Sequence, residues 1–543
     1  MQDSEVTSKD NLEIKTALVS TFDKTGLVEF ARTLKEKGVS LIATGGTLAA
    51  LRDSGFDATP LDKIARFPEM LDGRVKTLQP EIFAGILARK NKSDHMSQIE
   101  EKGISPIDMV VCNFYAFEET AQRDSVEDEL IEMIDIGGPS IVRAAAKNFE
   151  STCVVPSPEF YDRVSMELES KKGISIATRR ALATAAFGIV ASYDISIYNA
   201  LSERFYPERG FPESYFLSAK RFEEPKYGEN PGQGAMIYSL SNTAGGIREW
   251  KQLFGDVRSY NNYLDIASAF DILEGFEDSP AAATVKHGQI SGFGLSSSLS
   301  DAYRLAHGCD PDADFGNTTV LNRNVDVETA KLVGRNEGAK DDSVYTEILV
   351  APSYDTEALE ILKLKQKKKM RIIQAGRKSS YPYDVRVMQG LVLVQDSADY
   401  RKKLSSSSIS IESAARPTGK DFTILLGLWE VARRVESNGI VIGNGEVDPD
   451  GTLAKLWTLG VGTFRKRNGA AKIALDNAGI RSRGAYCASD GFFPFSDSVE
   501  LLGKAGIRAV IQPGGSLNDR KVTEAANAFG MCMLFTHERA FKH

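Results

Sequence analysis

The sequence predicts an α/β protein built on a doubly wound parallel sheet, with helices on its faces. Short apolar runs such as TALVST (16–21) and VSLIAT (39–44) have the length and composition of buried strands. The amphipathic segment KTGLVEFARTLKEKG (24–38) follows the first run and ends on a glycine suited to cap a helix. Strands and helices alternate in this way, with short links, through the helix-rich segment 175–204. Such alternation is typical of a parallel sheet.

Composition indicates an ordinary globular protein. The net charge of −8 argues against broad binding to nucleic acid or to an anionic membrane, both of which need a basic face. We find no run of about 18 apolar residues and no apolar segment near the start, so we expect neither a membrane span nor a secretory signal. The cysteines are few and scattered, which argues against a disulfide framework or a zinc site and fits a cytoplasmic protein without a catalytic metal. They are Cys112, Cys153, Cys309, Cys487 and Cys532.

Composition changes once along the chain. The region 205–235 is rich in proline, glycine and aromatic residues, as in RFYPERGFPESY and EEPKYGENPGQG, and we expect a domain boundary there. The sequence therefore predicts a tail over 1–15, a first domain over 16–205 and a second over 206–543. We find no repeat of fixed short period.

One candidate anion site lies where strands end in the first domain. IATGGT (42–47) joins a strand to a helix, and the N–H groups at such a helix start bind anions. Lys24 follows the preceding strand, and ligands of doubly wound sheets sit beyond the carboxyl ends of strands. Arg74 and Lys76 add positive charge. The alternatives are a tight turn and solvated surface cations.

Two further stretches suggest acid–base or oxyanion chemistry. In IDIGGPSIVRAAAKNF (134–149), Asp135 precedes two glycines and a helix that carries Lys147. Asp135 could accept a proton and Lys147 could stabilise an oxyanion; the alternative is a capped helix with a charged face. In TVKHGQISGFG (284–294), Lys286 and His287 stand together in a glycine-rich turn, where the alternative is an ordinary surface turn.

Several motifs in order resemble one known family. They are DKTGLVEFA, ATGGT, PEMLDGRVKTL, AGILAR, IDIGG, RAAAKN, YGENP, VKH, APSYDTEALEIL, and ASDGFFPF with VIQPGGS. Together, from about residue 16 to His543, they resemble the bifunctional purine-biosynthesis enzymes that join 5-aminoimidazole-4-carboxamide ribonucleotide (AICAR) formyltransferase to IMP cyclohydrolase. The resemblance implies a methylglyoxal-synthase-like cyclohydrolase domain to about residue 205. It implies a formyltransferase of two cytidine-deaminase-like subdomains after it, and no deaminase zinc motif is found there.

The resemblance also implies a reaction sequence. A formyl group would pass from the co-substrate 10-formyltetrahydrofolate to AICAR, and formyl-AICAR would then close to IMP with loss of water. The partners would be AICAR, formyl-AICAR, IMP and a reduced folate. Members of this family are homodimers with formyltransferase sites across the subunit interface, and a structural potassium ion is compatible with the family.

Site residues follow from the same resemblance. His287 would transfer the proton of the AICAR amine, Lys286 would assist it electrostatically, and Asn438 would orient the formyl group or the histidine. The nucleotide in the formyltransferase would contact Lys226, Tyr227, Arg467, Arg539 and Phe541. Ring closure would use Lys76, Tyr115, Asp135 and Lys147. Phosphate and ribose would be held by Lys24, Thr44, Gly45, Gly46, Thr47, Arg74 and Thr77, and Gly137 would also bind the substrate.

The sequence departs from the family pattern at several positions. Gln79 and Phe83 replace usual histidines, and Phe22 replaces a usual serine. Lys226 replaces an arginine whose bidentate fork a lysine cannot form. A segment resembling an insertion, GNGEVDPDGTLAKLW (443–457), precedes GVGTFRKRN (460–468). Two alternatives therefore remain: a member that acts on an AICAR analogue or another formyl donor, and a cyclohydrolase with an inactive, nucleotide-binding formyltransferase half.

Overall fold

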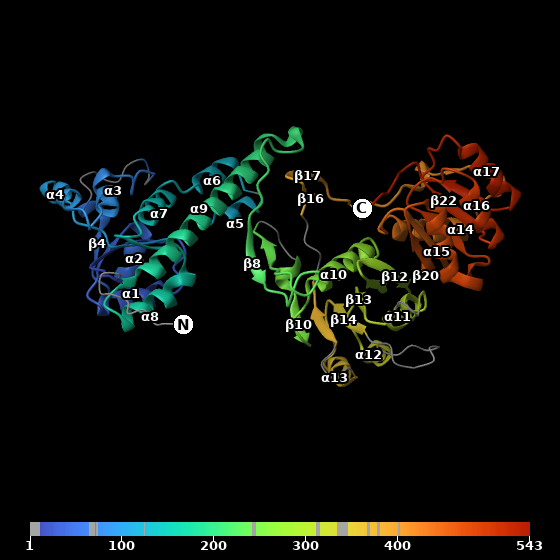
Figure 1. Cartoon of the computed structure of the whole chain (residues 1–543), viewed down its shortest axis with the longest axis horizontal. Helices are drawn as coiled ribbons and strands as arrows, with labels where there is room; N and C mark the ends of the chain where they lie inside the picture. Colours follow the sequence, from blue (N-terminus) through green and yellow to red (C-terminus); the bar gives the residue numbers. More distant parts are fainter. Residues whose placement is uncertain are drawn as a thin grey trace. The chain divides into compact units, whose positions relative to one another are not determined.

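The structure, a computed structural model of the chain, contains two compact units, Met1–Ser218 and Ala219–His543 (Figure 1). It describes residues 11–64, 71, 74–123, 125–241, 246–310, 315–333, 346–365, 370–376, 381–399 and 402–543. Helix α9 (Ile176–Phe205) ends at the predicted domain boundary, and the division between the units falls later, after Ser218.

Unit 1 contains a five-stranded sheet in the order β4-β3-β2-β5-β6, and every neighbouring pair is parallel. The strands are β2 (Thr16–Ser20), β3 (Ser40–Ala43), β4 (Ala58–Pro60), β5 (Met109–Cys112) and β6 (Cys153–Val155). The chain proceeds outward from β2 in one direction and then returns to β5 and proceeds in the other. The doubly wound parallel sheet predicted for the first domain is thus confirmed, and β2 and β5 flank its switch point.

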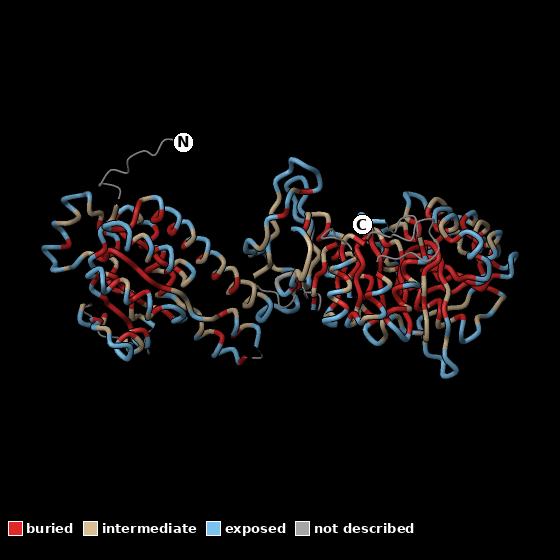
Figure 2. Tube along the Cα trace, turned by 90° about the horizontal axis from the view of Figure 1, so that it is seen from below, coloured by how far each residue is buried: buried red, intermediate tan, exposed pale blue. Residues whose placement is uncertain are grey.

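Two groups of helices cover this sheet: α1 packs with α8, while α3, α7 and α9 pack together. The helices are α1 (Leu27–Glu36), α2 (Gly45–Asp53), α3 (Pro80–Leu87), α4 (Ser93–Glu101), α5 (Phe117–Ala121), α6 (Glu127–Glu132), α7 (Gly137–Lys147), α8 (Tyr161–Ser170) and α9. Buried residues concentrate on the strands and the inner faces of the helices (Figure 2). Two strand residues, Asn11–Leu12 (β1), pair with β7 (Ile174–Ser175), so the predicted tail 1–15 belongs partly to the fold of unit 1.

Among the described residues, α9 is long and apolar enough to cross a membrane by length and composition alone. Part of this helix packs in the core of unit 1. Leu182, Ala186 and Val190 are buried in the same hydrophobic cluster as the sheet. Phe187 and Phe205 of the same helix are exposed.

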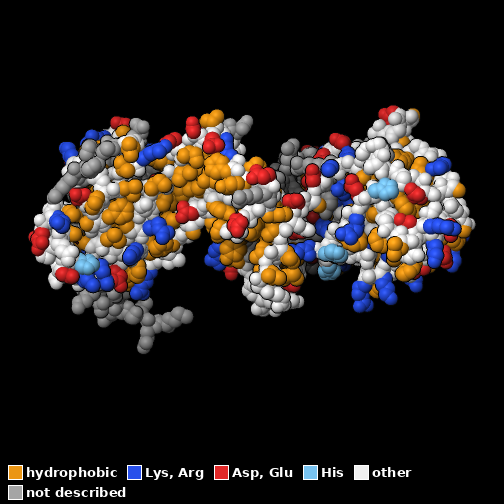
Figure 3. Space-filling view, turned by 90° about the horizontal axis from the view of Figure 1, so that it is seen from above, with side chains coloured by type: hydrophobic (Ala, Val, Ile, Leu, Met, Phe, Trp, Pro, Cys, Tyr) orange, Lys and Arg blue, Asp and Glu red, His pale blue; other side chains and the backbone are white. Residues whose placement is uncertain are grey.

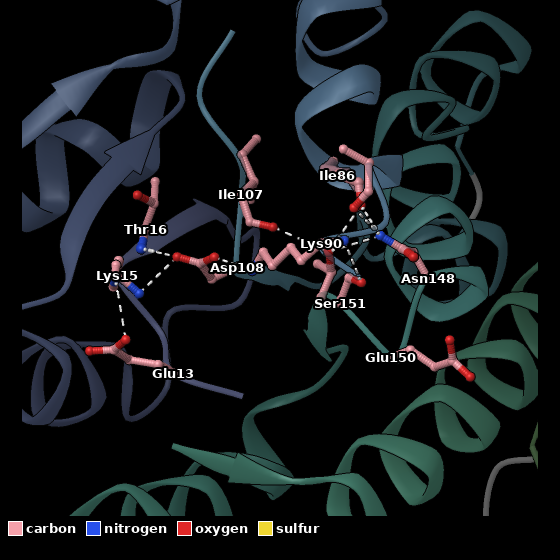
Figure 4. Close-up of polar contacts among 12 residues, drawn as sticks. Glu13, Lys15, Thr16, Ile86, Lys90, Ile107, Asp108, Asn148, Glu150 and Ser151 are labelled. Atoms are coloured by element: carbon pink, nitrogen blue, oxygen red, sulfur yellow. Dashed lines mark hydrogen bonds and ion pairs between the residues drawn. The ribbon is translucent and has the colours of Figure 1, made fainter. Parts of the chain in front are cut away.

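A buried carboxylate fixes the start of the central strand. Asp108 Oδ2 accepts hydrogen bonds from the backbone N–H groups of Lys15 and Thr16, each at 2.8 Å, and Oδ1 pairs with the Lys90 ammonium (Figure 4). Burial lowers the pKa of Lys90, and the attraction of Asp108 counteracts this. The carboxylate thereby holds the edge of the sheet opposite the carboxyl ends of the strands.

Unit 2 contains one twelve-stranded sheet made of two similar halves. Its order is β10-β15-β14-β13-β11-β12-β20-β19-β21-β22-β23-β18, and the halves meet where β12 pairs antiparallel with β20. The first half contains β10 (Lys251–Phe254), β11 (Ala281–Lys286), β12 (Gln289–Leu295), β13 (Asn317–Leu321), β14 (Thr346–Ala351) and β15 (Arg371–Gln374). The second contains β18 (Ser410–Ile411), β19 (Gly439–Val447), β20 (Leu453–Thr463), β21 (Tyr486–Ser489), β22 (Ala509–Gln512) and β23 (Cys532–Phe535).

Each half has the same sequence of pairings. From the junction outward, each half starts with a hairpin, β11–β12 or β19–β20, and the next strand, β13 or β21, pairs antiparallel with it. Two further strands then pair in parallel, and an antiparallel strand, β10 or β18, forms the outer edge. The helices also correspond in order: α10 (Tyr260–Leu273), α11 (Leu299–His307), α12 (Val327–Leu332) and α13 (Thr356–Lys365) in the first half, and α14 (Gly419–Ala432), α15 (Arg467–Ala478), α16 (Asp497–Lys504) and α17 (Asp519–Ala528) in the second. The two subdomains expected from the resemblance are therefore present as a structural repeat.

Paired glycines let a helix approach each hairpin closely. A Cβ added at Gly292 or Gly294 of β12 would meet backbone carbonyl oxygens of α11. A Cβ added at Gly460 or Gly462 of β20 would meet those of α15 in the same manner. Since a helix backbone cannot retreat from such a contact without moving as a whole, these four positions require glycine.

We predict that Gly294→Ala lowers the stability of unit 2 by about 1–3 kcal/mol, the range found for overpacked cores. The measurement is the thermal and urea unfolding of the full chain. Gly419→Ala is the matched control, because Gly419 starts α14 and a Cβ there meets nothing within 4 Å. Equal unfolding midpoints for the two variants would contradict the close packing described above.

Two candidate active sites

Unit 1 has a cavity of about 510 Å³ at the carboxyl edge of its sheet. It is lined by the residues that follow β2, β3 and β5 and by the start of α7. The structure brings together here ten of the predicted residues: Lys24, Thr44, Gly46, Thr47, Arg74, Lys76, Thr77, Tyr115, Asp135 and Gly137. Because this is where a doubly wound sheet binds its ligands, the position itself favours a binding site.

Two helix N-termini and a lysine make one end of the cavity electropositive. Helices α2 and α7 both begin there, with Gly45 and Gly137 as their first residues. The Lys76 ammonium lies against Gly45, where a Cβ would displace it, and the Thr77 hydroxyl lies against Gly137 in the same way. Backbone N–H groups, a hydroxyl and an ammonium suit a phosphate or a developing oxyanion.

Asp135 is a half-buried titratable group in this site. Its Oδ1 accepts a hydrogen bond of 2.8 Å from the Gly138 N–H, and its own N–H donates to the Tyr193 hydroxyl at 2.8 Å. Burial raises the pKa of Asp135 from its ordinary value, although the N–H groups of Gly138 and Gly137 counteract the rise. A carboxyl with a raised pKa can exchange a proton with a substrate nearer neutral pH than an exposed aspartate can.

The opposite side of the cavity is formed by loops that sequence reasoning covered only in part. Asn113, directly after β5, accepts hydrogen bonds from the N–H groups of Phe22 and Asp23 at 2.7 and 2.9 Å and so fixes the loop before Lys24. The Phe22 and Tyr115 rings lie 5.5 Å apart. Asn113 was missed, yet the rule that ligands meet strand ends would have indicated it.

Lys147 does not line this cavity. It ends α7, so ten residues of helix, about 15 Å of rise, separate it from Gly137 at the cavity. It lines a second, wider cavity of about 780 Å³ together with Arg143, Phe83 and Phe187. Within one chain, the structure therefore separates Lys147 from Lys76, Tyr115 and Asp135.

Unit 2 presents Lys286 and His287 on the tight turn between β11 and β12. His287 and Gly288 both have positive φ, 55° and 74°, as a two-residue type I′ hairpin turn requires. Asp265 of α10 accepts a 2.6 Å hydrogen bond from the Gly288 N–H, which holds the turn on the helix. Burial raises the pKa of Asp265, while the Gly288 N–H and the charge of His287 counteract the rise.

The turn borders a cavity of about 270 Å³ lined by Lys286, His287 and Thr463, among others. His287 is exposed, and the Lys286 ammonium donates to the Phe315 carbonyl at 2.7 Å. Gln289, two residues after the histidine, bonds to Thr463 of β20 at 2.9 Å and also to Glu436. The first half of the sheet thus presents its reactive turn to the second half.

Asn438 lies beside this junction and is part of a bonded cluster. Its amide oxygen accepts from Arg467 at 2.9 Å, and its amide nitrogen donates to the Phe464 carbonyl at 3.0 Å. The C-terminal residues pack on the same segment, since the Ser437 N–H donates to the Lys542 carbonyl at 2.8 Å. The Phe541 ring lies under the guanidinium groups of Arg467 and Arg539, at 5.9 and 4.6 Å.

Lys226 and Tyr227 are not part of the cluster around Asn438. They occur on the connection between β8 (Ala219–Glu223) and β9 (Ile237–Leu240), where the Lys226 ammonium is 6.0 Å from the Tyr227 ring. Neither lines the cavity beside His287. In the part of the chain that the structure describes, no group of three His, Cys, Asp or Glu residues is placed to hold a metal ion, and all five cysteines are buried thiols.

Comparison with known proteins agrees with this arrangement. A family model described as AICARFT/IMPCHase bienzyme matches residues 145–477, more than half of the chain, and one described as MGS-like domain matches residues 26–140. The bifunctional purine biosynthesis protein PurH of Oceanobacillus iheyensis is 40% identical over 97% of this chain and 100% of that protein. PurH of Caldicellulosiruptor bescii is 38% identical over the same shares. A crystal structure of ForH is 34% identical, with a TM-score of 0.32, over 35% of this chain and 99% of that one.

The whole length of the relatives is therefore represented here, with a methylglyoxal-synthase-like unit followed by a repeated α/β unit. The chain belongs to the AICARFT/IMPCHase bienzyme family, the bifunctional formyltransferases and cyclohydrolases of purine biosynthesis.

Proposed function

We propose that unit 2 transfers a formyl group from 10-formyltetrahydrofolate to AICAR and that unit 1 closes the resulting formyl-AICAR to IMP with loss of water, in the cytoplasm. The observation that carries the proposal is the cavity of unit 1, in which ten residues predicted for the cyclohydrolase come together although they are spread from Lys24 to Gly137. The Lys286–His287 turn supports the formyltransferase assignment.

Ring closure needs the carboxamide nitrogen to attack the formyl carbon of the same molecule. The cavity can hold that conformer by its phosphate, with the starts of α2 and α7 and Lys24 around the anion. Lys76 with Thr77 stabilises the oxyanion that forms when the nitrogen attacks; Asp135 takes the proton of the attacking nitrogen and returns it to that oxygen. The resulting hydroxyl then leaves as water together with the second nitrogen-bound hydrogen. Lys147 remains a prediction for this step that the contacts within one chain do not support.

Formyl transfer forms a bond from the AICAR amine nitrogen to the formyl carbon and breaks the bond from that carbon to the folate nitrogen. His287 accepts the amine proton and returns it to the departing folate nitrogen, so the histidine is regenerated. Lys286 stabilises the negative charge on the formyl oxygen in the tetrahedral intermediate. The Asp265 bond to Gly288 keeps this pair at the tip of its turn.

We predict that Asp135→Asn lowers the cyclohydrolase kcat by about 10²-fold or more, the usual size of a lost general base. Asparagine can still accept the Gly138 N–H but cannot take a proton. Because burial raises the pKa of Asp135, the wild-type rate should fall as the pH drops through that raised value, and the variant should lack this acidic limb. The assay follows IMP from supplied formyl-AICAR across pH. Asp57→Asn, at an exposed carboxyl of the same unit, is the control, and an unaltered rate and profile for Asp135→Asn would refute the assignment.

We predict that His287→Ala lowers formyl transfer by about 10²-fold or more and leaves ring closure of supplied formyl-AICAR unchanged. The experiment mixes protein, AICAR and 10-formyltetrahydrofolate and identifies IMP by mass. His95→Ala, in unit 1, is the matched histidine control. Failure of the wild type to form IMP from AICAR, while it still converts formyl-AICAR, would leave the inactive-half alternative standing.

We also propose that the chain is a homodimer, because it exposes apolar surface that one copy leaves uncovered. The hairpin of β16 (Tyr383–Met388) and β17 (Leu391–Asp396) is a two-stranded sheet by itself, and Val387 and Leu391 are 79% and 63% exposed. Cross-strand pairs such as Val387 with Val392 and Met388 with Leu391 make both of its faces apolar. A lone two-stranded sheet is marginal in water, so this hairpin needs a covering surface.

Unit 1 exposes a further apolar area (Figure 3). Helix α9 and the segment after it carry exposed large side chains: Phe187, Phe205, Tyr206, Phe211, Phe216 and Leu217. Exposed apolar patches of this kind mark protein–protein contacts in soluble proteins.

We predict that Val387→Glu weakens self-association by at least about tenfold, since a charge would be buried in the contact. Sedimentation equilibrium over a range of protein concentrations measures the change. Gln389→Glu adds the same charge at the turn of the same hairpin and is the control. A wild type that stays monomeric while it forms IMP at full rate would contradict the homodimer.

A further inference from the structure

The repeat in unit 2 places two different side chains at one equivalent position. Leu321 ends β13 and pairs with Ala282 of β11, while Ser489 ends β21 and pairs with Ile440 of β19. The next residues are Asn322 and Asp490. Each donates its backbone N–H at 3.2 Å to the residue that begins the neighbouring hairpin strand, Ala281 in one half and Gly439 in the other. The two positions therefore correspond in backbone bonding.

In the first half the side chain closes the fold locally. The Asn322 oxygen accepts the Ala281 N–H at 2.8 Å, and its nitrogen donates to the Phe276 and Ser279 carbonyls at 2.9 Å each. All three partners are backbone groups. A neutral amide is thus sufficient for the structural task at this position.

In the second half a buried carboxylate takes different partners. Asp490 has no exposed surface, and its two carboxylate oxygens accept from the Arg467 guanidinium and from the Ser437 hydroxyl. Its backbone carbonyl accepts the Ala540 N–H at 2.9 Å. Since burying a carboxylate is costly and an amide serves in the other half, the charge at Asp490 calls for a reason beyond closing the strand.

The partners of Asp490 determine how Asn438 is presented. Arg467 can only donate, so the Asn438 atom 2.9 Å from it is the amide oxygen; the Phe464 carbonyl can only accept, so the atom 3.0 Å from it is the nitrogen. The amide therefore cannot flip, and its second N–H remains as a donor with no partner among the described residues. Ser437 holds the adjacent backbone through the same carboxylate.

We propose that Asp490 is a positioning residue for formyl transfer: through Arg467 and Ser437 it locks the Asn438 amide with one N–H directed to the reacting groups. The Arg467 guanidinium is needed as a fork, since one nitrogen bonds to Asp490 and to the Gly439 carbonyl at 3.2 Å while the other reaches Asn438. The inference rests on the proposed formyl transfer in unit 2 and adds to it the residue that orients Asn438.

The test is a double-mutant cycle on the kcat of formyl transfer, with Asp490→Asn, Asn438→Ala and both together. We expect Asp490→Asn to lower kcat by about 10- to 100-fold, the size expected when a catalytic group is misplaced by about 1 Å. In the Asn438→Ala background the same change should lower kcat by less than about twofold, because the group that Asp490 positions is gone. Release of tetrahydrofolate is followed, so that ring closure does not enter the rate.

Two controls separate positioning from damage to the fold. Asp421→Asn removes a buried carboxylate that pairs with Arg508 at 2.9 Å and Tyr486 at 2.6 Å, at the other end of β21, and should leave kcat unchanged. Ring closure of supplied formyl-AICAR by unit 1 should be equal in every variant. Should Asp490→Asn fail to fold, Ser437→Ala takes its place in the cycle, because it removes the hydroxyl through which Asp490 holds the backbone beside Asn438.

Several results would contradict the positioning role of Asp490. Equal losses from Asp490→Asn with and without Asn438, or no loss at all, would overturn the positioning role. Full activity of Asn438→Ala would also overturn the positioning role, since Asn438 would then make no contribution to formyl transfer for Asp490 to support. A wild type without formyl transfer would instead refute the proposed function of unit 2, and the inference with it.

Discussion

Side-chain oxygens that accept backbone N–H groups hold the loops on which both sites depend. Asn113 fixes the loop before Lys24, Asp135 fixes the start of α7, and Asp265 fixes the turn that carries His287. In each case a side chain from one element accepts the N–H of a loop or helix start. Because removal of the acceptor would leave the loop N–H without its protein partner, hydrogen bonds of this kind favour one loop conformation.

The side chains that hold these loops differ in how far the sequence predicts them, and so do the residues of the two sites. Lys24 and Thr44 follow apolar runs, and the rule for parallel sheets places such residues at one edge, where the cavity of unit 1 lies. Asp490 follows the apolar strand β21 as Asn113 follows β5, so its position at a strand end is readable from the sequence, whereas Asp265 lies inside a helix and carries no comparable signal. Their partners are set by tertiary packing, which spacing along the chain does not encode. Lys147 is the opposite case. It lies close to Asp135 in the sequence, but the length of α7 separates the two residues in space.

The sequence pattern predicted the fold of unit 1, where strands and helices alternate regularly. It did not reveal the repeat of unit 2, whose two halves differ in sequence. The alternation of strands and helices was sufficient for the parallel sheet of unit 1. The repeat in unit 2 was invisible to a search for short periods, because its halves share the order of strands and the glycine pairs on β12 and β20 rather than a run of identical residues. The two subdomains were expected from the family resemblance, and the structure shows one local feature that they share: each glycine pair admits a helix at backbone contact.

The departure at residues 443–457 contributes no residue to the lining of the cavity beside His287. This segment forms the end of β19, a turn closed by the Asp448 N–H bonding to the Thr452 carbonyl at 2.8 Å, and the start of β20. Thr463, which borders the His287 cavity, stands at the other end of β20, eleven residues long and therefore about 33 Å from the turn. The last two residues of the segment, Leu456 and Trp457, pair with Leu295 and Gly294 of β12, so the segment also contributes to the junction of the two halves. Gln289 and Thr463, which hold the Lys286–His287 turn against the second half, lie at the opposite end of β20 from the turn of this hairpin.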